Sequence, residues 1–214
     1  MKKIFFIILI LPFLALKAQK LGEMAPEKPL ENFPKNSWGV DFMFGEGGFG
    51  LGTFYRHNLS SALTGFVDFS ISEAKDDQEM EYYDYFRQEY VTYNKKNRIF
   101  LLPVNFGLQQ RLFEHSITEN LRPYINFGVG PSIVITTPYE KEFFNSFGSA
   151  QAKYTAGGYV GLGANFGLDK SSLLGINLRY YVIHFFDKGV ESLNNKFQKN
   201  LGGFYLTINL GIMY

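Results

Sequence analysis

Apolar side chains recur at every second position in several segments of this chain, and the last such segment runs from Phe204 to Tyr214. Its even positions are all apolar, whereas its odd positions, among them Thr207, Asn209 and Gly211, are mostly small or polar. Alternation with period two is typical of a strand with one apolar and one polar face. The segment has the length of a tilted strand that crosses a bilayer. The pattern therefore predicts a strand that places its apolar face against lipid.

Eight segments alternate in this way, and the connections between them also follow a rule. The second, fourth and sixth connections are short, whereas the third, fifth and seventh are long. The first connection, residues 46–48, is short where a long one is expected, so it is either a tight hairpin or a misplaced strand end. Pro103 lacks the N–H that a central strand needs and predicts a bulge. The predicted strands cover residues 37–45, 49–56, 63–72, 99–112, 122–133, 158–168, 173–185 and 204–214.

The beginning of the chain has the features of a secretory signal peptide over residues 1–18. Lys2 and Lys3 precede an apolar run, residues 4–16, that is too short to cross a bilayer as a helix. We expect cleavage after Ala18, a polar periplasmic leader over residues 19–36, and a barrel over residues 37–214. No later apolar run is long enough for a helical span, so a membrane location requires a closed barrel.

Composition excludes several classes of site. The chain has no cysteine, which excludes a lipidated cysteine anchor, disulfides and thiolate zinc sites, and its three histidines are scattered. Its 21 basic and 20 acidic residues leave no basic footprint for nucleic acid. We therefore expect no metal, no cofactor and no nucleic-acid partner.

The two faces of the predicted strands distinguish a membrane barrel from a soluble, lipocalin-like barrel. One face carries Val, Leu, Ile and Phe, whereas the other carries Gly, Asn, Asp, Arg, Thr and Tyr, and Lys and Glu are missing from the strand centres. We therefore expect Phe100, Leu162 and Ile208 to face outward. The predicted fold is all-β: a monomeric, eight-stranded, antiparallel, up-and-down transmembrane β-barrel.

Three segments carry a family likeness: residues 102–113 (LPVNFGLQQRLF), 122–133 (RPYINFGVGPSI) and 157–168 (GGYVGLGANFGL). They resemble the small outer-membrane β-barrel domain family, with OmpA/OmpX-like architecture. The aromatic Tyr214 at the end of the chain resembles the C-terminal signal for the barrel-assembly machinery. The resemblance implies the outer membrane of a Gram-negative bacterium, with lipid contacts and periplasmic termini. The family includes porin-like, adhesion or defence proteins and accessory barrels of secretion systems such as type IX.

Polar side chains on the inward faces form the first candidate site. An eight-stranded barrel is just wide enough for side chains to fill it, and buried charges need partners. We expect two aspartates and two arginines to neutralise one another in a closed plug; a narrow ion path and a small-ligand cavity are alternatives. Inward glycines of the fifth and sixth strands should make room for Phe54, Phe66, Tyr181 and Tyr205. The candidate network comprises Asp41, Arg56, Asp68, Asn105, Asn126, Asn165, Arg179 and Asn209.

The loop over residues 73–98 is the second candidate site, because it is rich in acidic and aromatic residues. Exposed tyrosines suit the recognition of a protein or glycan; alternatively, the strands run on and the tyrosines belong to the aromatic girdle. A Ca²⁺ site formed by Asp76, Asp77 and Glu79 is conceivable but lacks the EF-hand spacing. The candidate binding residues are Tyr82, Tyr83, Tyr85, Phe86, Tyr90 and Tyr93.

An enzyme is the remote alternative. Lipid A deacylases are eight-stranded barrels that use a His, a Ser and an acidic residue at the outer rim. His184 and Asp187 lie near that rim, but no serine stands two residues after His184, and the pair His115 and Ser116 falls in a periplasmic turn. We therefore expect no enzyme, but a surface structural or binding protein with a filled lumen. A small porin or an accessory barrel of a secretion system is the alternative.

Overall fold

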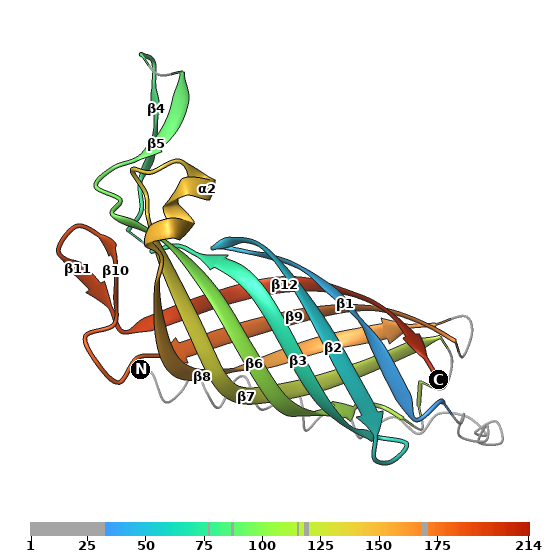
Figure 1. The fold of residues 1–214 in the computed structure, drawn as a ribbon. Coiled ribbons are helices and arrows are strands. Elements are labelled where there is room, and N and C mark those ends of the chain that lie inside the picture. The colour runs from blue at the N-terminus through green and yellow to red at the C-terminus, as the bar shows by residue number, and fades with distance from the viewer. Residues whose placement is uncertain (1–32, 77, 87, 115, 118–119, 168–170) are drawn as a thin grey trace, which may run out of the picture.

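The computed structural model describes residues 33–214 except residues 77, 87, 115, 118–119 and 168–170. The predicted signal peptide and residues 19–32 of the leader therefore lie outside the described residues, as does His115. Eight long strands form a closed barrel (Figure 1). They are β1 (Asn36–Gly45), β2 (Gly48–Asn58), β3 (Leu63–Ala74), β6 (Asn97–Arg111), β7 (Leu121–Pro138), β8 (Gln151–Phe166), β9 (Ser172–His184) and β12 (Asn200–Met213).

Each barrel strand pairs antiparallel with its neighbours along the chain, and β1 closes the barrel against β12. The closing seam continues past the last strand, because Asn36 N–H donates to the Tyr214 carbonyl at 3.0 Å and Tyr214 N–H donates to the Asn36 carbonyl at 2.9 Å. A closed barrel has no free edge, which satisfies the backbone groups that lipid cannot. The predicted up-and-down barrel of eight strands is confirmed.

The alternation of side chains places apolar residues outside and polar residues inside. Along β9 every second residue is buried from end to end. Leu162 on β8 is 59% exposed on the outer face, whereas Asn105 on β6 is completely buried in the lumen. The predicted inside-out arrangement is confirmed. No helix in the described part of the chain is long and apolar enough to cross a membrane.

Three details of the strands differ from the sequence prediction or settle it. The first connection is a tight hairpin, since Gly45 pairs with Gly48 across a two-residue turn. The bulge predicted at Pro103 is wrong, because β6 keeps one register with β7 on both sides of the proline and the ladder is only interrupted there. Strands β7 and β8 extend beyond their predicted ends, with pairs as far as Thr136 and Gln151. Val134 places an apolar side chain on the inner face of this extension, so the contrast between the two faces of β7 is lost there.

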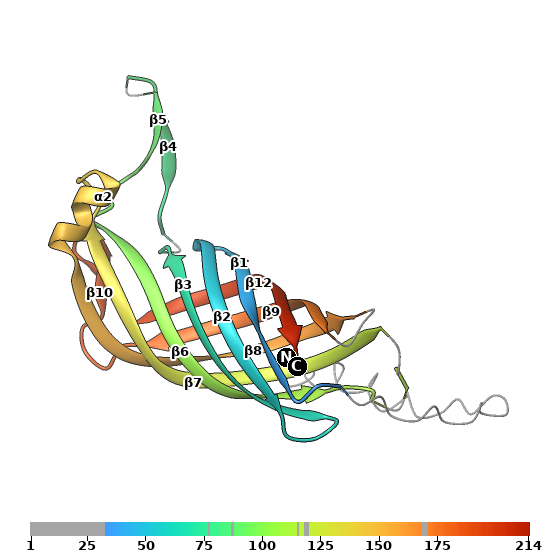
Figure 2. The same ribbon diagram turned by 45° about the vertical axis from the view of Figure 1, so that its right-hand side comes forward.

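The long connections and the tight β1–β2 hairpin lie at one end of the barrel, and the other short turns and the C-terminus lie at the opposite end (Figures 1 and 2). We call these the loop end and the terminal end. We call the three long loops at the loop end the crown; it comprises residues 75–96, 139–150 and 185–199. It contains two small hairpins, β4 (Glu81–Asp84) with β5 (Glu89–Thr92) and β10 (Val190–Leu193) with β11 (Lys196–Gln198), and the short helices α2 (Phe143–Ser146) and η1 (Phe147–Ser149).

Candidate functional site

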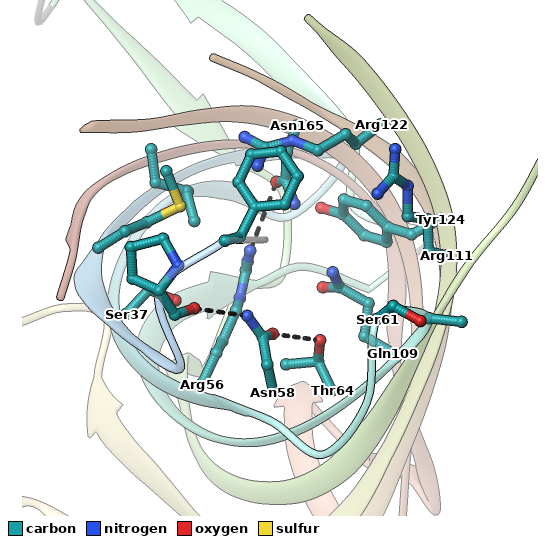
Figure 3. Close-up of a pocket in the computed structure, with 15 residues that line it drawn as sticks. Ser37, Arg56, Asn58, Ser61, Thr64, Gln109, Arg111, Arg122, Tyr124 and Asn165 are labelled. Carbon is teal, nitrogen blue, oxygen red and sulfur yellow. Dashed lines mark hydrogen bonds between the residues drawn. The ribbon is translucent and has the colours of Figure 1, made fainter. Parts of the chain in front are cut away.

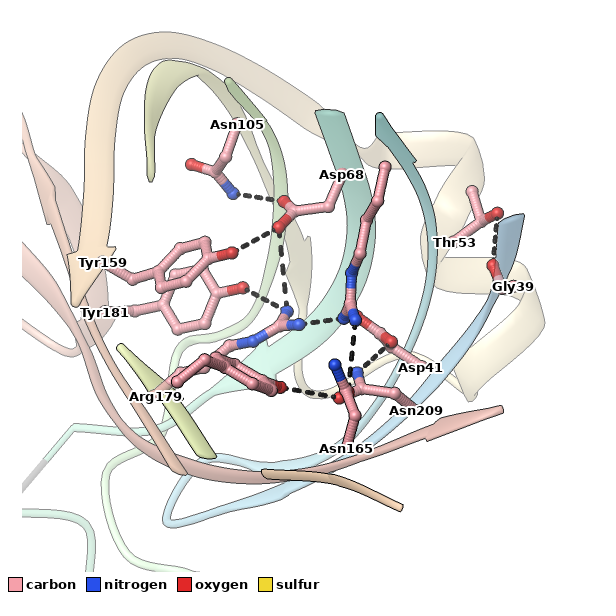
Figure 4. A network of polar contacts seen from close by, with 12 residues as sticks. Gly39, Asp41, Thr53, Asp68, Asn105, Tyr159, Asn165, Arg179, Tyr181 and Asn209 are labelled. Carbon is pink, nitrogen blue, oxygen red and sulfur yellow. Dashed lines mark hydrogen bonds and ion pairs between the residues drawn. The ribbon is translucent and has the colours of Figure 1, made fainter. Parts of the chain in front are cut away.

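A single arginine organises the charged centre of the lumen. Arg179, on β9, lies with its guanidinium 3.0 Å from Asp41 on β1 and 3.8 Å from Asp68 on β3 (Figure 4). All three side chains are almost completely buried, and Arg179 is 1% exposed. Three strands that are distant in sequence therefore meet at one guanidinium on the barrel axis.

Neutral side chains complete the coordination of both aspartates. Asn105 Nδ2 donates to Asp68 Oδ1 at 2.8 Å, and the Tyr159 hydroxyl donates to Asp68 Oδ2 at 2.6 Å. The amide of Asn209 donates to Asp41. Charge-assisted hydrogen bonds of this kind are what make a buried carboxylate tolerable. The layer therefore acts as a hydrogen-bonded plug.

Arg56 does not share in this pairing, so the predicted match of two arginines with two aspartates is wrong in its stoichiometry. Its Nη1 donates to Asn165 Oδ1 at 3.4 Å, and its guanidinium carbon lies 4.2 Å from the centre of the Phe54 ring. Asn126 is also buried in the lumen, but its Oδ1 has no hydrogen-bond partner among the described residues. The predicted network is therefore centred on Arg179, with Arg56 and Asn165 forming a separate contact nearer the terminal end.

Inward glycines make room for the lumen side chains, as predicted, although for a different set of rings. A Cβ at Gly128 would lie 3.3 Å from Phe66, one of the predicted rings, and 3.1 Å from Tyr159. A Cβ at Gly163 would lie 2.7 Å from Tyr124. Tyr124 and Tyr159 were not singled out from the sequence, because period-two alternation gives the face of a residue and not its depth along the axis.

Each end of the lumen is closed by side chains. At the loop end eight buried apolar residues form one cluster: Ala74, Ile99, Leu101, Val134, Ile183, Phe185, Val190 and Leu201. At the terminal end Arg56, Arg111, Arg122 and Tyr124 surround a cavity of about 60 Å³ (Figure 3). Phe33, from the leader, lines this cavity, and its ring centre lies 4.1 Å from the Arg122 guanidinium. The predicted filled lumen therefore has an apolar layer, a charged layer and an aromatic closure in series.

The crown is held together by a buried ion pair that the sequence did not indicate. Lys95 Nζ lies 2.8 Å from Glu79 Oε2, with both side chains almost fully buried. The Ser192 hydroxyl donates to the other oxygen of Glu79 at 2.6 Å, which links the loop before β6 to the loop before β12. Because these residues are far apart in sequence, no local pattern marks them.

These contacts do not favour the conceivable Ca²⁺ site. Glu79 is occupied by Lys95 and Ser192, and Asp76 Oδ1 accepts the backbone N–H of Gln78 at 2.9 Å. Asp77 lies outside the described residues. Among the residues that the structure describes, no group of three His, Cys, Asp or Glu side chains is placed to hold a metal ion.

Ion pairs formed by exposed lysines also stabilise the crown. Lys96 Nζ lies 2.6 Å from Glu191 Oε2, and the backbone N–H of Asn195 donates to Glu191 Oε1. The hydrogen bond from Lys96 lowers the pKa of the Glu191 carboxyl. On the β4 side, the hydrogen bond from Lys75 likewise lowers the pKa of Glu81. These lysines therefore favour the ionised form of Glu191 and Glu81.

The tyrosine-rich hairpin β4–β5 projects away from the barrel (Figures 1 and 2). Tyr83 packs against Tyr85 and Tyr90, with ring centres 5.2 Å apart in each case. Tyr85 is 83% exposed, and Phe86, at the tip, is fully exposed. The candidate residues of this loop, Tyr82, Tyr83, Tyr85, Phe86, Tyr90 and Tyr93, are all exposed. This position favours a recognition element over the alternative of a girdle at the membrane surface.

A cleft of about 660 Å³ opens at the base of this hairpin. Tyr90 and Tyr93 line it from the hairpin, and Arg98 and Tyr139 line it from the barrel rim. The Arg98 guanidinium stacks 4.8 Å from the centre of the Tyr139 ring. Its volume lies in the range of small-molecule sites, and the mixture of aromatic walls and polar groups suits a ligand that offers both.

The structure does not join the residues of the enzyme alternative into a catalytic unit. His184 Nδ1 lies 2.7 Å from Asn200 Oδ1, whereas Asp187 pairs with Lys153 at 3.0 Å. The pKa of the Asp187 carboxyl is lowered, mainly by the hydrogen bond from the backbone N–H of Gly189 and next by the hydrogen bond from Lys153. Each side chain therefore has its own local partner.

Comparison with known proteins identifies the fold. No protein-family model matches the sequence, and no curated protein matches it. The crystal structure of Neisserial surface protein A, NspA, superposes with a TM-score of 0.56 at 11% identity and covers 86% of this chain and 100% of its own. This chain has the fold of a small outer-membrane β-barrel.

Two further outer-membrane structures match this small outer-membrane barrel with lower scores. OprG from Pseudomonas aeruginosa has a TM-score of 0.47 at 12% identity, covering 87% of this chain and 99% of its own. Ail, the attachment invasion locus protein of Yersinia pestis, has a TM-score of 0.45 at 12% identity, covering 86% of this chain and 100% of its own.

Proposed function

We propose that this small outer-membrane barrel is a surface-exposed binding protein, with both termini in the periplasm and the crown outside the cell. In this orientation the turns after β2, β6 and β8 face the periplasm, and the three long loops face the exterior together with the tight β1–β2 hairpin. Short periplasmic turns and long outer loops are the usual arrangement of such barrels. The partner is an extracellular protein or glycan that contacts the hairpin β4–β5 and the cleft at its base. The barrel is a monomer, and the proposal includes no catalytic step.

One observation carries this proposal: a closed barrel supports a crown that is itself rigidly joined. The Glu79–Lys95 pair and the Ser192 hydrogen bond fix the loops relative to one another. Preorganised loops lose little entropy on binding. The exposed rings on the hairpin supply contact area at a low cost in side-chain entropy.

The rival function is transport, as a small porin or as an accessory barrel of a secretion system. A pore needs a continuous watery lumen, whereas here the Arg179 layer lies between an apolar cluster and the Phe33 closure. Planar-bilayer recording on the purified protein separates the two functions. Stable single-channel openings would support transport and contradict the closed lumen.

Cysteine labelling tests the orientation cleanly, because the native chain has no cysteine. A membrane-impermeant maleimide should label Tyr85→Cys on intact cells and should label Ser60→Cys only after the outer membrane is opened. Ser60 lies in the short turn between β2 and β3, at the opposite end of the barrel from Tyr85. The reverse labelling pattern would refute the proposed orientation.

To test binding, cells that display the barrel are applied to arrays of glycans and of purified extracellular proteins. A variant in which a Gly-Ser turn replaces residues 81–92 removes β4 and β5 and leaves the barrel strands intact. It should lose the signal that the native chain gives, while Ser60→Ala should keep it. Equal signals from the native and the trimmed protein would refute the role of the hairpin.

Assembly is a further part of this proposal. We expect the barrel-assembly machinery to read the last strand, with Tyr214 as the terminal aromatic. Tyr214 is 60% exposed at the closing seam, and its backbone hydrogen bonds to Asn36 do not depend on its ring. Tyr214→Ser should therefore lower the amount of barrel in the outer membrane but still refold in detergent. Failure to refold would point to a structural role instead.

A further inference from the structure

Three phenylalanines stand close together in the crown, between β7 and β8. Phe143, Phe144 and Phe147 lie on α2 and at the start of η1, and none of them is buried. Phe143 and Phe147 are four residues apart and so share one helix face, with Phe144 beside them. Phe144 is 80% exposed. Large apolar side chains gathered in this way mark an interaction surface.

The helix packs on the outer wall of the barrel rather than over its mouth. The Phe147 ring stacks on Phe100 with ring centres 5.7 Å apart, and the Phe143 ring lies 6.2 Å from Phe100. Phe100, on β6, alternates with Leu101, which belongs to the buried cluster inside the lumen. Phe100 therefore points outward, beside Ile135 of β7 and Glu73 of β3, with which it pairs, and the aromatic cluster continues the outer wall of the barrel at its loop-end edge.

The cluster also lies at the right height for the edge of the membrane. From Phe100 to Leu108 strand β6 rises about 20 Å along the axis at a tilt of about 40°, which is most of an apolar band of about 25 Å. Tyr154, on β8, is 80% exposed beside Ile133, with which it pairs. Aromatic side chains ring such barrels at both membrane surfaces, so Phe100 and Tyr154 mark the loop-end girdle.

The polar side chains of the segment have local partners, and the guanidinium of Arg98 lies 5.9 Å from the centre of the Phe143 ring. The Ser146 hydroxyl donates to the carbonyl of Phe143 at 2.6 Å, and Asn145 Nδ2 donates to Glu142 Oε2 at 2.9 Å. The side chain of Lys141 donates to Ser149. A short helix with an aromatic face and locally satisfied polar groups is suited to the interface between lipid and water.

We propose that α2 and η1 are a membrane-interfacial anchor, and that Phe143, Phe144 and Phe147 insert among the lipid chains at the outer surface of the bilayer. The occupant of this patch is lipid, because the patch is continuous through Phe100 with the lipid-facing wall. Nothing in the cleft at the base of β4–β5 is needed for it. The anchor would hold the crown at a fixed tilt relative to the membrane.

Tryptophan fluorescence tests the insertion directly. The only native tryptophan, Trp38, is on the outer face of β1 and can be replaced by phenylalanine to give a dark background. In that background Phe144→Trp is reconstituted in phosphatidylcholine vesicles with brominated acyl chains. Its emission should be quenched to the same extent as that of Trp38 in the native protein. The matched control is Phe86→Trp at the tip of the hairpin, which should be unaffected by brominated lipid and strongly quenched by acrylamide.

Two results would overturn the anchor. If Phe144→Trp behaves like Phe86→Trp, the patch faces water. If it is shielded from both quenchers and the protein crosslinks as a dimer, the occupant is a second copy of this chain. A second variant guards against a folding defect: Phe144→Ser keeps the contacts of Phe100 with Phe143 and Phe147, so the barrel should still show heat-modifiable migration. In vesicles, trypsin should cleave after Lys141 several-fold faster in Phe144→Ser than in the native protein. An unchanged rate would also count against insertion.

Discussion

Removing the central arginine should have a large effect on the stability of the barrel. Arg179→Met keeps most of the side-chain volume but leaves Asp41 and Asp68 buried without their cation. Breaking a buried ion pair by removing one partner costs about 3–5 kcal/mol. That cost corresponds to about a 10²- to 10⁴-fold loss in the equilibrium constant for folding. Urea unfolding in phospholipid vesicles, followed by Trp38 emission and by gel migration, measures it.

Two further variants make this prediction specific. Arg56→Met removes an arginine of equal size that contacts an amide and a ring rather than carboxylates, so it should cost only about 1–2 kcal/mol. Combining Arg179→Met with Asp41→Asn and Asp68→Asn removes the stranded charges and should recover most of the lost stability. The reasoning is refuted if Arg179→Met costs no more than Arg56→Met, or if the triple variant is as unstable as the single one.

Three other predictions concern the closures and the crown. Phe33→Ala removes the ring at the terminal mouth and about 0.5–2 kcal/mol of cation–π stabilisation, but bilayer conductance should stay at background, and stable channels would contradict the closed lumen. Glu79→Gln leaves Lys95 buried without its carboxylate, so trypsin should cut beside β4–β5 faster while gel migration is unchanged; unchanged cleavage would refute the role of the pair. Because Lys96 lowers the pKa of Glu191, the ionised carboxylate stabilises the crown above its unfolded pKa of about 4.3 and the effect is lost as pH falls through the lowered value. The protection factors for amide exchange, which correct for the pH dependence of the intrinsic rate, should therefore fall in β10–β11 below about pH 4 but not in β9, and a fall in both would contradict it.

The barrel follows from the sequence because lipid outside and side chains inside impose one strict alternation on every strand. For this reason the outward direction of Leu162 and the inward direction of Asn105 could be predicted. The extensions of β7 and β8 could not, since Val134 on the inner face of β7 is apolar and removes the contrast between the two faces. The loop between β7 and β8 was therefore expected to begin at residue 134, whereas β7 continues to Pro138.

The contacts within each site were harder to predict than its members. Alternation placed Arg56 and Arg179 inside, but depth along the axis decides which of them meets the aspartates, and depth depends on the register of all eight strands. Glu79 and Ser192 lie in different loops, and no pattern in either points to the other. The aromatic anchor did leave a local signal, since residues 143–147 read FFNSF within an otherwise polar loop.

The closures at the two ends of the barrel have a consequence for its response to salt. Dissolved ions cannot reach the Arg179 layer, so its attraction for the aspartates is not weakened by added electrolyte. In the crown, the Lys96 and Lys153 side chains are exposed to solvent, so dissolved ions screen their ion pairs, with a screening length of about 8 Å at physiological ionic strength. The stability of the barrel should therefore not depend on ionic strength, whereas the crown should become more rigid at low ionic strength and more flexible at high ionic strength.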